Sequence, residues 1–191
     1  MSMDDLPRVE VRSAAELDDW LAANHGRDEG VWLVTWKASC RDRYVSRDAV
    51  LDALLAWGWI DGRRKVLDES RTMQLIAPRR QQAWAQSYKD RVARLEGEGR
   101  MRPPGLARVA EGRASGLWDF YADVDRLEVP GDLAEALEAR PGARAGYEAA
   151  PPAYRRNLLR WVKLARTEAT RQARIAKIVA SAAEGTRIPQ M

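Results

Sequence analysis

Two short runs hold the side chains of this chain that are best suited to binding a ligand. Residues 57–62 read Trp-Gly-Trp-Ile-Asp-Gly, and residues 77–80 read Ala-Pro-Arg-Arg. Arginines can hold a carboxylate or a phosphate through paired N–H donors, and Trp rings beside them would reduce their hydration. The two runs therefore predict a pocket for an anion. Its predicted members are Trp57, Trp59, Asp61, Arg79, Arg80 and Trp84.

Both runs also have a structural interpretation. The first can end a helix, with its Trp rings in the core and Asp61 fixing a tight turn, and the second can be a surface loop. A pocket needs the two runs to meet in space. A hairpin between them would return Ala77 near Ile60 or Asp61. Arg79 or Arg80 would then lie within reach of the Asp61 carboxylate.

The chain offers few groups for catalysis. Its single histidine, His25, stands at the end of a predicted helix, where it suits a cap or a surface position better than acid–base chemistry. Its single cysteine, Cys40, is expected to be a loop residue without a functional role. One histidine and one cysteine are too few to form a zinc site from His and Cys ligands. We therefore expect no metal, no cofactor and no enzymatic activity, with the catalytic residues of any reaction unknown. A hydrolase or transferase that uses Asp61 with Arg79 or Arg80 is the third alternative.

The composition is that of an ordinary globular protein. The chain has 191 residues, of which 46% are hydrophobic and 31% are charged, so it can bury a core without a disulfide. A single cysteine indicates a reducing compartment. The acidic start, Met1 to Pro7, does not resemble a signal peptide, and no window approaches the roughly 18 apolar residues of a membrane span. We expect a soluble, cytoplasmic protein, and the oligomeric state is left open.

Charge is distributed in alternating blocks along the chain. The net charge is −4 over residues 1–59, +6 over 60–115, −5 over 116–150 and +7 over 151–191. These blocks can neutralise each other within the fold, or they can leave a basic face for an anionic partner. The second interpretation makes weak, sequence-unspecific nucleic-acid binding the alternative function, although a small anionic molecule is the favoured partner.

β-Branched and aromatic residues predict strands over 31–37, 63–67 and 72–77, the last two as a hairpin. Serines in capping positions predict helices that begin at Ser13 and Ser46. The fold class is therefore α+β, with a small, mostly antiparallel sheet and helices in the N-terminal half.

The C-terminal half is expected to be all-helical. In the segment after Ala153, apolar side chains lie on one helix face and basic side chains on the other, and Thr167 can cap a final helix. We expect a single domain over residues 1–191, made of an α+β portion, 1–100, and a helical portion, 101–191, packed on it.

Taken together, several runs resemble the bacteriocin-protection, YdeI/OmpD-associated family of bacterial proteins. The runs are Trp20-Leu21, Asn24-His25, Gly30-Val-Trp-Leu33, Gly58-Trp-Ile-Asp-Gly62, Pro78-Arg79-Arg80, Trp84, Gly99-Arg-Met101, Ala165-Arg-Thr-Glu-Ala-Thr-Arg171 and Arg174-Ile175. The resemblance implies a part in resisting bacteriocins or envelope-active peptides, and it implies no settled reaction, cofactor or catalytic residue. We therefore predict a non-enzymatic stress or resistance protein that binds an anionic small molecule or partner.

The sequence departs from the family pattern at three places. The family tends to have serines around Trp84 where this chain has alanines, and Tyr88 stands near the position of a family asparagine. Arg166 replaces the usual lysine before the Thr-Arg signature. If the family serines and asparagine contact a ligand, this chain has changed those contacts.

Overall fold

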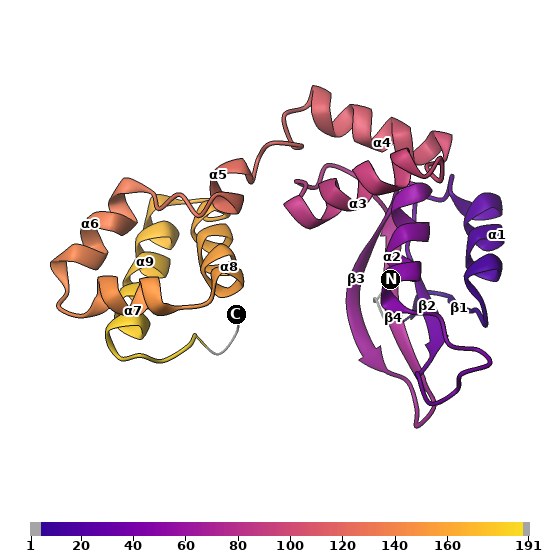
Figure 1. Ribbon diagram of the computed structural model, residues 1–191, viewed down its shortest axis with the longest axis horizontal. Coiled ribbons are helices and arrows are strands. Elements are labelled where there is room, and N and C mark those ends of the chain that lie inside the picture. Colours follow the sequence, from indigo (N-terminus) through magenta and orange to yellow (C-terminus); the bar gives the residue numbers. More distant parts are fainter. Residues whose placement is uncertain (1–4, 189–191) are drawn as a thin grey trace. The chain divides into compact units, whose positions relative to one another are not determined.

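The computed structural model describes residues 5–188. The chain divides into two compact units, Met1–Asp119 and Phe120–Met191. Figure 1 shows a sheet with helices in the first unit and helices alone in the second. The α+β class is confirmed, and no strand occurs in the described residues beyond 100. The packing of the helical portion on the α+β portion stays a prediction.

The sheet of the first unit has four strands in the order β1-β2-β4-β3. Their bounds are Arg8–Glu10 for β1, Val31–Trp36 for β2, Trp59–Val66 for β3 and Arg71–Pro78 for β4. β1 pairs with β2 in parallel, and the other pairings are antiparallel. The hairpin is longer than predicted, because β3 already begins at Trp59, which pairs with Pro78. Asp61 and Gly62 therefore lie in a strand with an irregular register and do not form a tight turn.

Two capped helices cover one face of this sheet. In α1 (Ala14–Asn24) the Ser13 hydroxyl accepts the Glu16 N–H, and in α2 (Arg47–Ala56) the Ser46 hydroxyl accepts the Ala49 N–H. The core between sheet and helices is formed by Val11, Leu17, Leu21, Val31, Leu33, Val45, Val50, Leu54, Trp59 and Ile76. Burial of this apolar surface is what holds the strand that carries Asp61 in place.

The next two helices, α3 (Gln86–Gly97) and α4 (Pro103–Ala114), complete the first unit. They bury Trp84, Val92, Leu95 and Val109 against Leu55 of α2. Gly105 lets α4 approach α2 closely, because a Cβ at this position would lie 2.2 Å from the Ala56 carbonyl oxygen. This crossing fixes α4 beside the segment that follows β4.

The second unit has five helices among its described residues. Their bounds are Ala122–Asp125 for α5, Gly131–Ala139 for α6, Ala143–Ala149 for α7, Pro152–Lys163 for α8 and Glu168–Ala183 for α9. Thr167 caps α9 as predicted, by accepting the Thr170 N–H at 3.1 Å. The core contains Leu133, Leu137, Tyr147, Leu158, Leu159, Val162, Ile175, Ile178 and Val179. No helix in the described part of the chain is long and apolar enough to cross a membrane.

Candidate functional site

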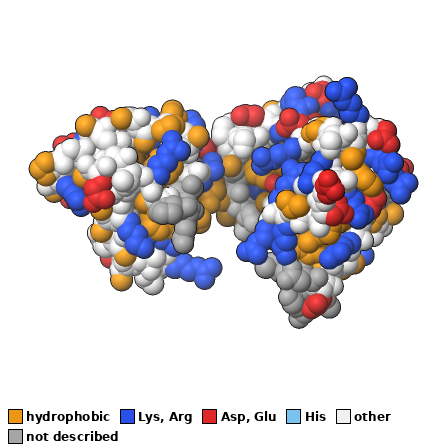
Figure 2. Space-filling view, turned by 90° about the horizontal axis from the view of Figure 1, so that it is seen from below, with side chains coloured by type: hydrophobic (Ala, Val, Ile, Leu, Met, Phe, Trp, Pro, Cys, Tyr) orange, Lys and Arg blue, Asp and Glu red, His pale blue; other side chains and the backbone are white. Residues whose placement is uncertain are grey.

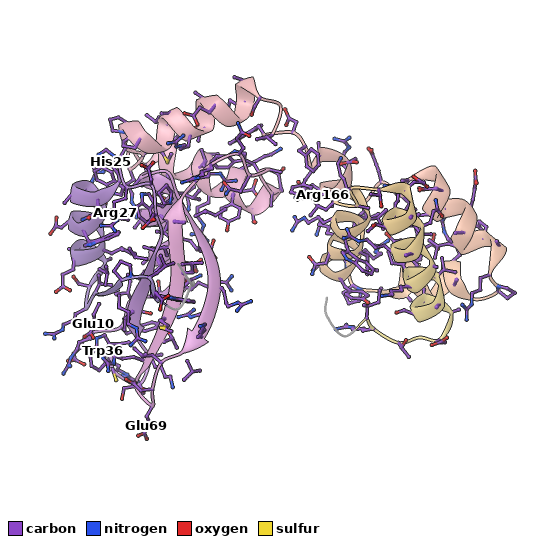
Figure 3. All side chains as sticks on the ribbon, turned by 180° about the vertical axis from the view of Figure 1, so that it is seen from behind. Glu10, His25, Arg27, Trp36, Glu69 and Arg166 are labelled. Carbon is purple, nitrogen blue, oxygen red and sulfur yellow. The ribbon has the colours of Figure 1, made fainter. Side chains whose placement is uncertain are left out.

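Trp57 lies against α1, on the surface of the first unit. Its Nε1 donates to Asp18 Oδ1 at 2.7 Å, and its ring stacks on His25 with 5.4 Å between the ring centroids. The guanidinium of Arg102 lies 5.7 Å from the Trp57 ring. His25 is the C-cap residue of α1, and Figure 3 shows it at that helix end. Through these contacts Trp57 and His25 hold helices together, which gives both residues a structural role.

Trp59, two residues further on, is fully buried. Its exposed fraction is 0%, and its ring meets that of Trp20 edge to face at 5.5 Å. The alternation of side chains along a strand turns Trp59 toward α1 and α2, into the core. Trp59 therefore supports the fold beneath the site and has no surface to offer a ligand.

Arg79 and Arg80 are adjacent, but they have opposite environments. The Arg79 side chain is 1% exposed, whereas Arg80 is exposed and donates from Nη2 to the Asp28 carbonyl oxygen at 2.7 Å. The backbone N–H of Arg79 donates to the Gly58 carbonyl oxygen at 2.8 Å, which continues the pairing of β4 with β3. Arg79 consequently points inward, while Arg80 stays on the surface.

The guanidinium of Arg79 is stacked on an aromatic ring. Its central carbon lies 3.6 Å from the centroid of Trp84 and 5.4 Å from that of Tyr88. Nη2 donates to the carbonyl oxygens of Gln82 and Ala83, at 3.4 Å and 3.1 Å. Nε and Nη1 are buried and have no hydrogen-bond partner. A buried guanidinium with two unpaired nitrogens is energetically costly, so this cation stands out in the structure.

Asp61 lies close to Arg79, but it forms no ion pair with it. Asp61 accepts one hydrogen bond from the Tyr88 hydroxyl and one from Gln74 Nε2, the latter at 3.1 Å. Tyr88 thus contacts both charged groups, with its hydroxyl on the carboxylate and its ring beside the guanidinium. We call Asp61, Gln74, Arg79, Trp84 and Tyr88 the Arg79 cluster.

Burial sets the protonation of this cluster. Loss of hydration lowers the pKa of Arg79 to about 10, and electrostatic interactions with Tyr88 and Asp61 only partly oppose the change. Burial, followed by the hydrogen bond to Asp61, raises the pKa of Tyr88 above its ordinary value. At neutral pH Arg79 is therefore a cation and Tyr88 is a protonated donor.

Trp84 links the Arg79 cluster to a surface cavity of about 420 Å³, which we call the Trp84 cavity. It is lined by Arg80, Gln81, Gln82, Trp84, Arg108, Glu111, Gly112, Ala114, Ser115 and Leu117. A Cβ on Gly112 would lie 2.4 Å from Trp84 Nε1, so this glycine allows the ring to fit beneath α4. Two of the predicted site residues, Arg80 and Trp84, thus line one cavity, and Arg79 supports the ring from inside.

Sequence reasoning did not select three residues of this region. Tyr88 was noted only as a departure from the family pattern, and Arg108 was one charge among many. Gln74 gives a signal in hindsight, since it lies two residues before Ile76, on the same core-facing side of β4, and is itself 8% exposed. A polar residue on a core-facing strand position usually needs a partner, and here the partner is Asp61.

The charge blocks of the first unit are joined by ion pairs. Asp52 of α2 is 6% exposed and is contacted by Arg91, Arg94 and Arg100. Burial alone would raise the pKa of Asp52, but hydrogen bonds from Arg94 and Arg91 outweigh it and lower the pKa below its ordinary value. The acidic block 1–59 and the basic block 60–115 therefore neutralise each other in part.

The second unit repeats this pattern. Lys163 binds Asp123 at 2.6 Å, Arg171 binds Asp132 at 2.6 Å, and Arg160 lies 3.4 Å from Asp125. On the face shown in Figure 2, Lys and Arg side chains are interspersed with acidic and hydrophobic ones. The pairing reduces the basic surface that a nucleic acid could contact.

Residues 5–188 contain no group of three or more His, Cys, Asp or Glu side chains that could hold a metal ion. Cys40 is a free, half-buried thiol.

Comparison with known proteins gave two family matches. Residues 9–108 match the model described as Domain of unknown function (DUF8412). Residues 126–185 match the model described as Bacteriocin-protection, YdeI or OmpD-Associated. The resemblance is thereby confirmed in the second unit, whereas the runs between Trp20 and Met101 fall within the other match. No curated protein and no solved structure matches the chain.

Proposed function

The chain belongs to the family described as Domain of unknown function (DUF8412), and its residues 126–185 match the bacteriocin-protection model. From this we propose that it is a non-enzymatic protein of the bacteriocin-resistance type. We further propose that it binds an anionic small molecule in the Trp84 cavity. The match of residues 126–185 supports the resistance role. The side chains around Trp84 support the anionic ligand, and the steps of that argument follow.

The observation that carries the proposal is the buried Arg79 cation behind the Trp84 ring. No carboxylate pairs with Arg79 among the described residues, and two of its nitrogens lack a partner. A guanidinium without an ion-pair partner in a poorly hydrated place favours a further anion nearby, because the attraction between charges is stronger where water is excluded. The Trp84 ring lies between this charge and the cavity.

The mouth of the cavity adds to the positive potential. Arg80 donates to the Asp28 carbonyl oxygen and pairs with no acidic side chain in the described part of the chain. Arg108 binds Glu111 at 2.7 Å, so one cation and one ion pair face the cavity. An incoming carboxylate or phosphate can bind Arg80 directly and compete with Glu111 for Arg108.

The surroundings of the acid–base groups favour a binding role over catalysis. Asp61 is held by Tyr88 and Gln74, and His25 is stacked on Trp57. The hydroxyl beside Asp61 is that of Tyr88, whose raised pKa keeps it protonated, and His25 packs on a Trp ring. We therefore propose that the ligand leaves the site chemically unchanged.

Titration of the full chain with phosphate, pyrophosphate and citrate tests the proposal, with Trp fluorescence and the melting temperature as readouts. Arg80→Gln should weaken binding about tenfold at an unchanged melting temperature, since it removes one exposed charge–anion contact. Arg79→Met should also weaken binding, because it removes the electrostatic attraction behind the ring, while it keeps most of the packing on Trp84. Trp84→Phe should remove most of the fluorescence response.

Arg63→Gln is the matched control, because Arg63 is an exposed cation on β3 outside the cavity. It should leave the affinity unchanged. If none of the three anions changes either readout, or if Arg79→Met and Arg63→Gln bind as the original chain does, the proposed anion site is wrong.

A further inference from the structure

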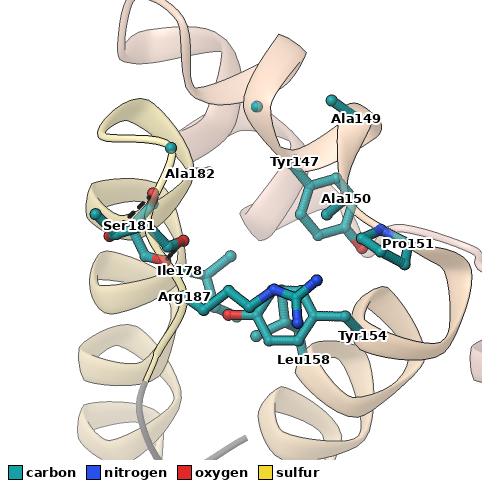
Figure 4. Close-up of a pocket in the computed structure, with 13 residues that line it drawn as sticks. Tyr147, Ala149, Ala150, Pro151, Tyr154, Leu158, Ile178, Ser181, Ala182 and Arg187 are labelled. Carbon is teal, nitrogen blue, oxygen red and sulfur yellow. Dashed lines mark hydrogen bonds between the residues drawn. The ribbon is translucent and has the colours of Figure 1, made fainter.

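The second unit contains a cavity of its own, shown in Figure 4. Its volume is about 250 Å³, and it lies among α7, α8 and the end of α9. All of its lining residues except Thr186 and Arg187 fall within the region that matches the bacteriocin-protection family. We call it the Tyr147 cavity. It is lined by Gly146, Tyr147, Ala149, Ala150, Pro151, Tyr154, Leu158, Ile178, Ser181, Ala182, Gly185, Thr186 and Arg187. None of these residues belongs to the Arg79 cluster or the Trp84 cavity.

Small residues create this space. Gly146 brings α7 against α9 so closely that a Cβ there would lie 2.0 Å from the Ala182 carbonyl oxygen. Around this crossing, alanines stand where larger side chains would fill the volume. Leu158 and Ile178 form the apolar walls, so the cavity favours an apolar body. Its volume corresponds to about eight water-sized groups, which limits the ligand to a small molecule.

Two tyrosines and one arginine supply the polar groups. Tyr147 is 2% exposed, and its hydroxyl is buried without a hydrogen-bond partner. The Tyr154 hydroxyl accepts the Ile188 N–H at 2.9 Å, which leaves its own proton free to donate. The guanidinium of Arg187 lies 5.3 Å from the Tyr154 ring, and Figure 4 shows it reaching across that ring from the segment after α9.

The protonation of Tyr147 fits a donor. Burial raises the pKa of Tyr147, although the charges of Arg155 and Arg144 oppose the change. A buried hydroxyl that keeps its proton and has no partner is an unsatisfied hydrogen-bond donor, and such groups are rare in folded proteins. An acceptor atom from a bound molecule would satisfy it.

We propose that the Tyr147 cavity binds a small apolar carboxylate. The ring or branched chain of the ligand contacts Leu158 and Ile178, and its carboxylate accepts from the Tyr147 hydroxyl and faces the Arg187 guanidinium. A carboxylate matches the free donors of the cavity, which are the two tyrosine hydroxyls and the Arg187 guanidinium, because the Ser181 and Thr186 hydroxyls already donate to each other's carbonyl oxygens. This site is independent of the anion site proposed for the first unit.

Benzoate and benzyl alcohol are matched probes for this proposal, because they share a ring and differ in charge. Heteronuclear NMR of the full chain should show benzoate shifting the signals of Tyr147, Tyr154 and Ile178. Benzoate should bind about tenfold more tightly than benzyl alcohol, as expected for a charge-assisted contact. Arg187→Gln should remove this preference, and Tyr147→Phe should weaken benzoate by a similar factor.

Arg166→Gln is the control for charge. Arg166 is an exposed cation between α8 and α9, labelled in Figure 3, and it does not line the cavity. It should leave both affinities unchanged. Ala150→Leu should block binding by filling the space. If that variant does not fold, Tyr147→Phe decides, since it removes one oxygen that has no partner.

Three results would overturn the proposal. Benzoate could leave the signals of Tyr147 and Ile178 unmoved, or benzyl alcohol could bind as tightly as benzoate. Alternatively, Arg166→Gln could lower the affinity for benzoate as much as Arg187→Gln does. Benzoate binding would then depend on the overall positive charge of the protein and not on Arg187.

Discussion

Arg79 and Trp84 are stacked, with the guanidinium carbon 3.6 Å from the ring centroid. The loop between β4 and α3 turns so that the carbonyl oxygens of Gln82 and Ala83 also face this guanidinium. The cation is thus held by a ring and by backbone dipoles, without a carboxylate. Because the same ring lines the Trp84 cavity, only the Trp84 ring separates the buried Arg79 cation from a surface site.

The first prediction separates the packing of Arg79 from its charge. Arg79→Ala should lower the free energy of unfolding by about 2–4 kcal/mol, because it removes the stacking and leaves a cavity beside Trp84. Arg79→Met keeps most of the volume and removes the buried charge, so the change should stay within about 1 kcal/mol. Urea denaturation measures both. Equal losses for the two variants would mean that the charge itself stabilises the fold.

The second prediction concerns the hydrogen bond between Tyr88 and Asp61. Tyr88→Phe removes the donor and leaves the carboxylate with Gln74, so the free energy of unfolding should fall by about 1–3 kcal/mol. Tyr44→Phe is the control, because Tyr44 is 45% exposed. Thermal denaturation at neutral pH compares them. A Tyr88→Phe variant as stable as the Tyr44→Phe variant contradicts this account.

The third prediction is a pH dependence that arises from Asp52. Its pKa is lower in the folded chain than in the unfolded chain, where an aspartate has a pKa of about 3.9. The resulting stabilisation is fully present above that pH and is lost as the pH falls toward the lower folded pKa. Asp52→Asn should cost about 1–3 kcal/mol at pH 7 and reduce the loss of stability below about pH 4.

Urea midpoints measured from pH 7 to pH 3 check this prediction. Asp19→Asn is a suitable control, because Asp19 is exposed and forms no ion pair among the described residues. Parallel pH profiles for Asp52→Asn and the unaltered chain would show that Asp52 does not contribute to the acid sensitivity.

The fourth prediction compares two glycines of the second unit. Gly146→Ala should destabilise the unit by about 1–3 kcal/mol, because the added methyl group would overlap the Ala182 carbonyl and push α7 from α9. Gly131→Ala, at the start of α6, meets nothing within 4 Å and should be stabilising by about 0.4–1 kcal/mol. Calorimetry of the two variants should show shifts of opposite sign.

The sequence alone determined the features whose partners lie close together in the chain. Ser13, Ser46 and Thr167 were predicted as caps, and each accepts the N–H three residues further on, so both partners of the bond can be read locally. Strands β2 and β4 were recognisable from their β-branched residues. β1 was missed, because three residues carry too little periodicity to be seen.

Only the tertiary structure decided which of the predicted site residues meet. Trp57 and Trp59 are of one type and two positions apart, yet their partners Asp18 and Trp20 both come from α1, which is remote in the chain. Arg79 and Arg80 are adjacent, yet one is buried beneath Trp84 and the other is exposed. The start of β3 at Trp59 and the turn after β4 set these directions. Both depend on pairing between separated segments, since Arg79 pairs with Gly58 and Trp84 pairs with Leu117. No local sequence pattern specifies such pairings.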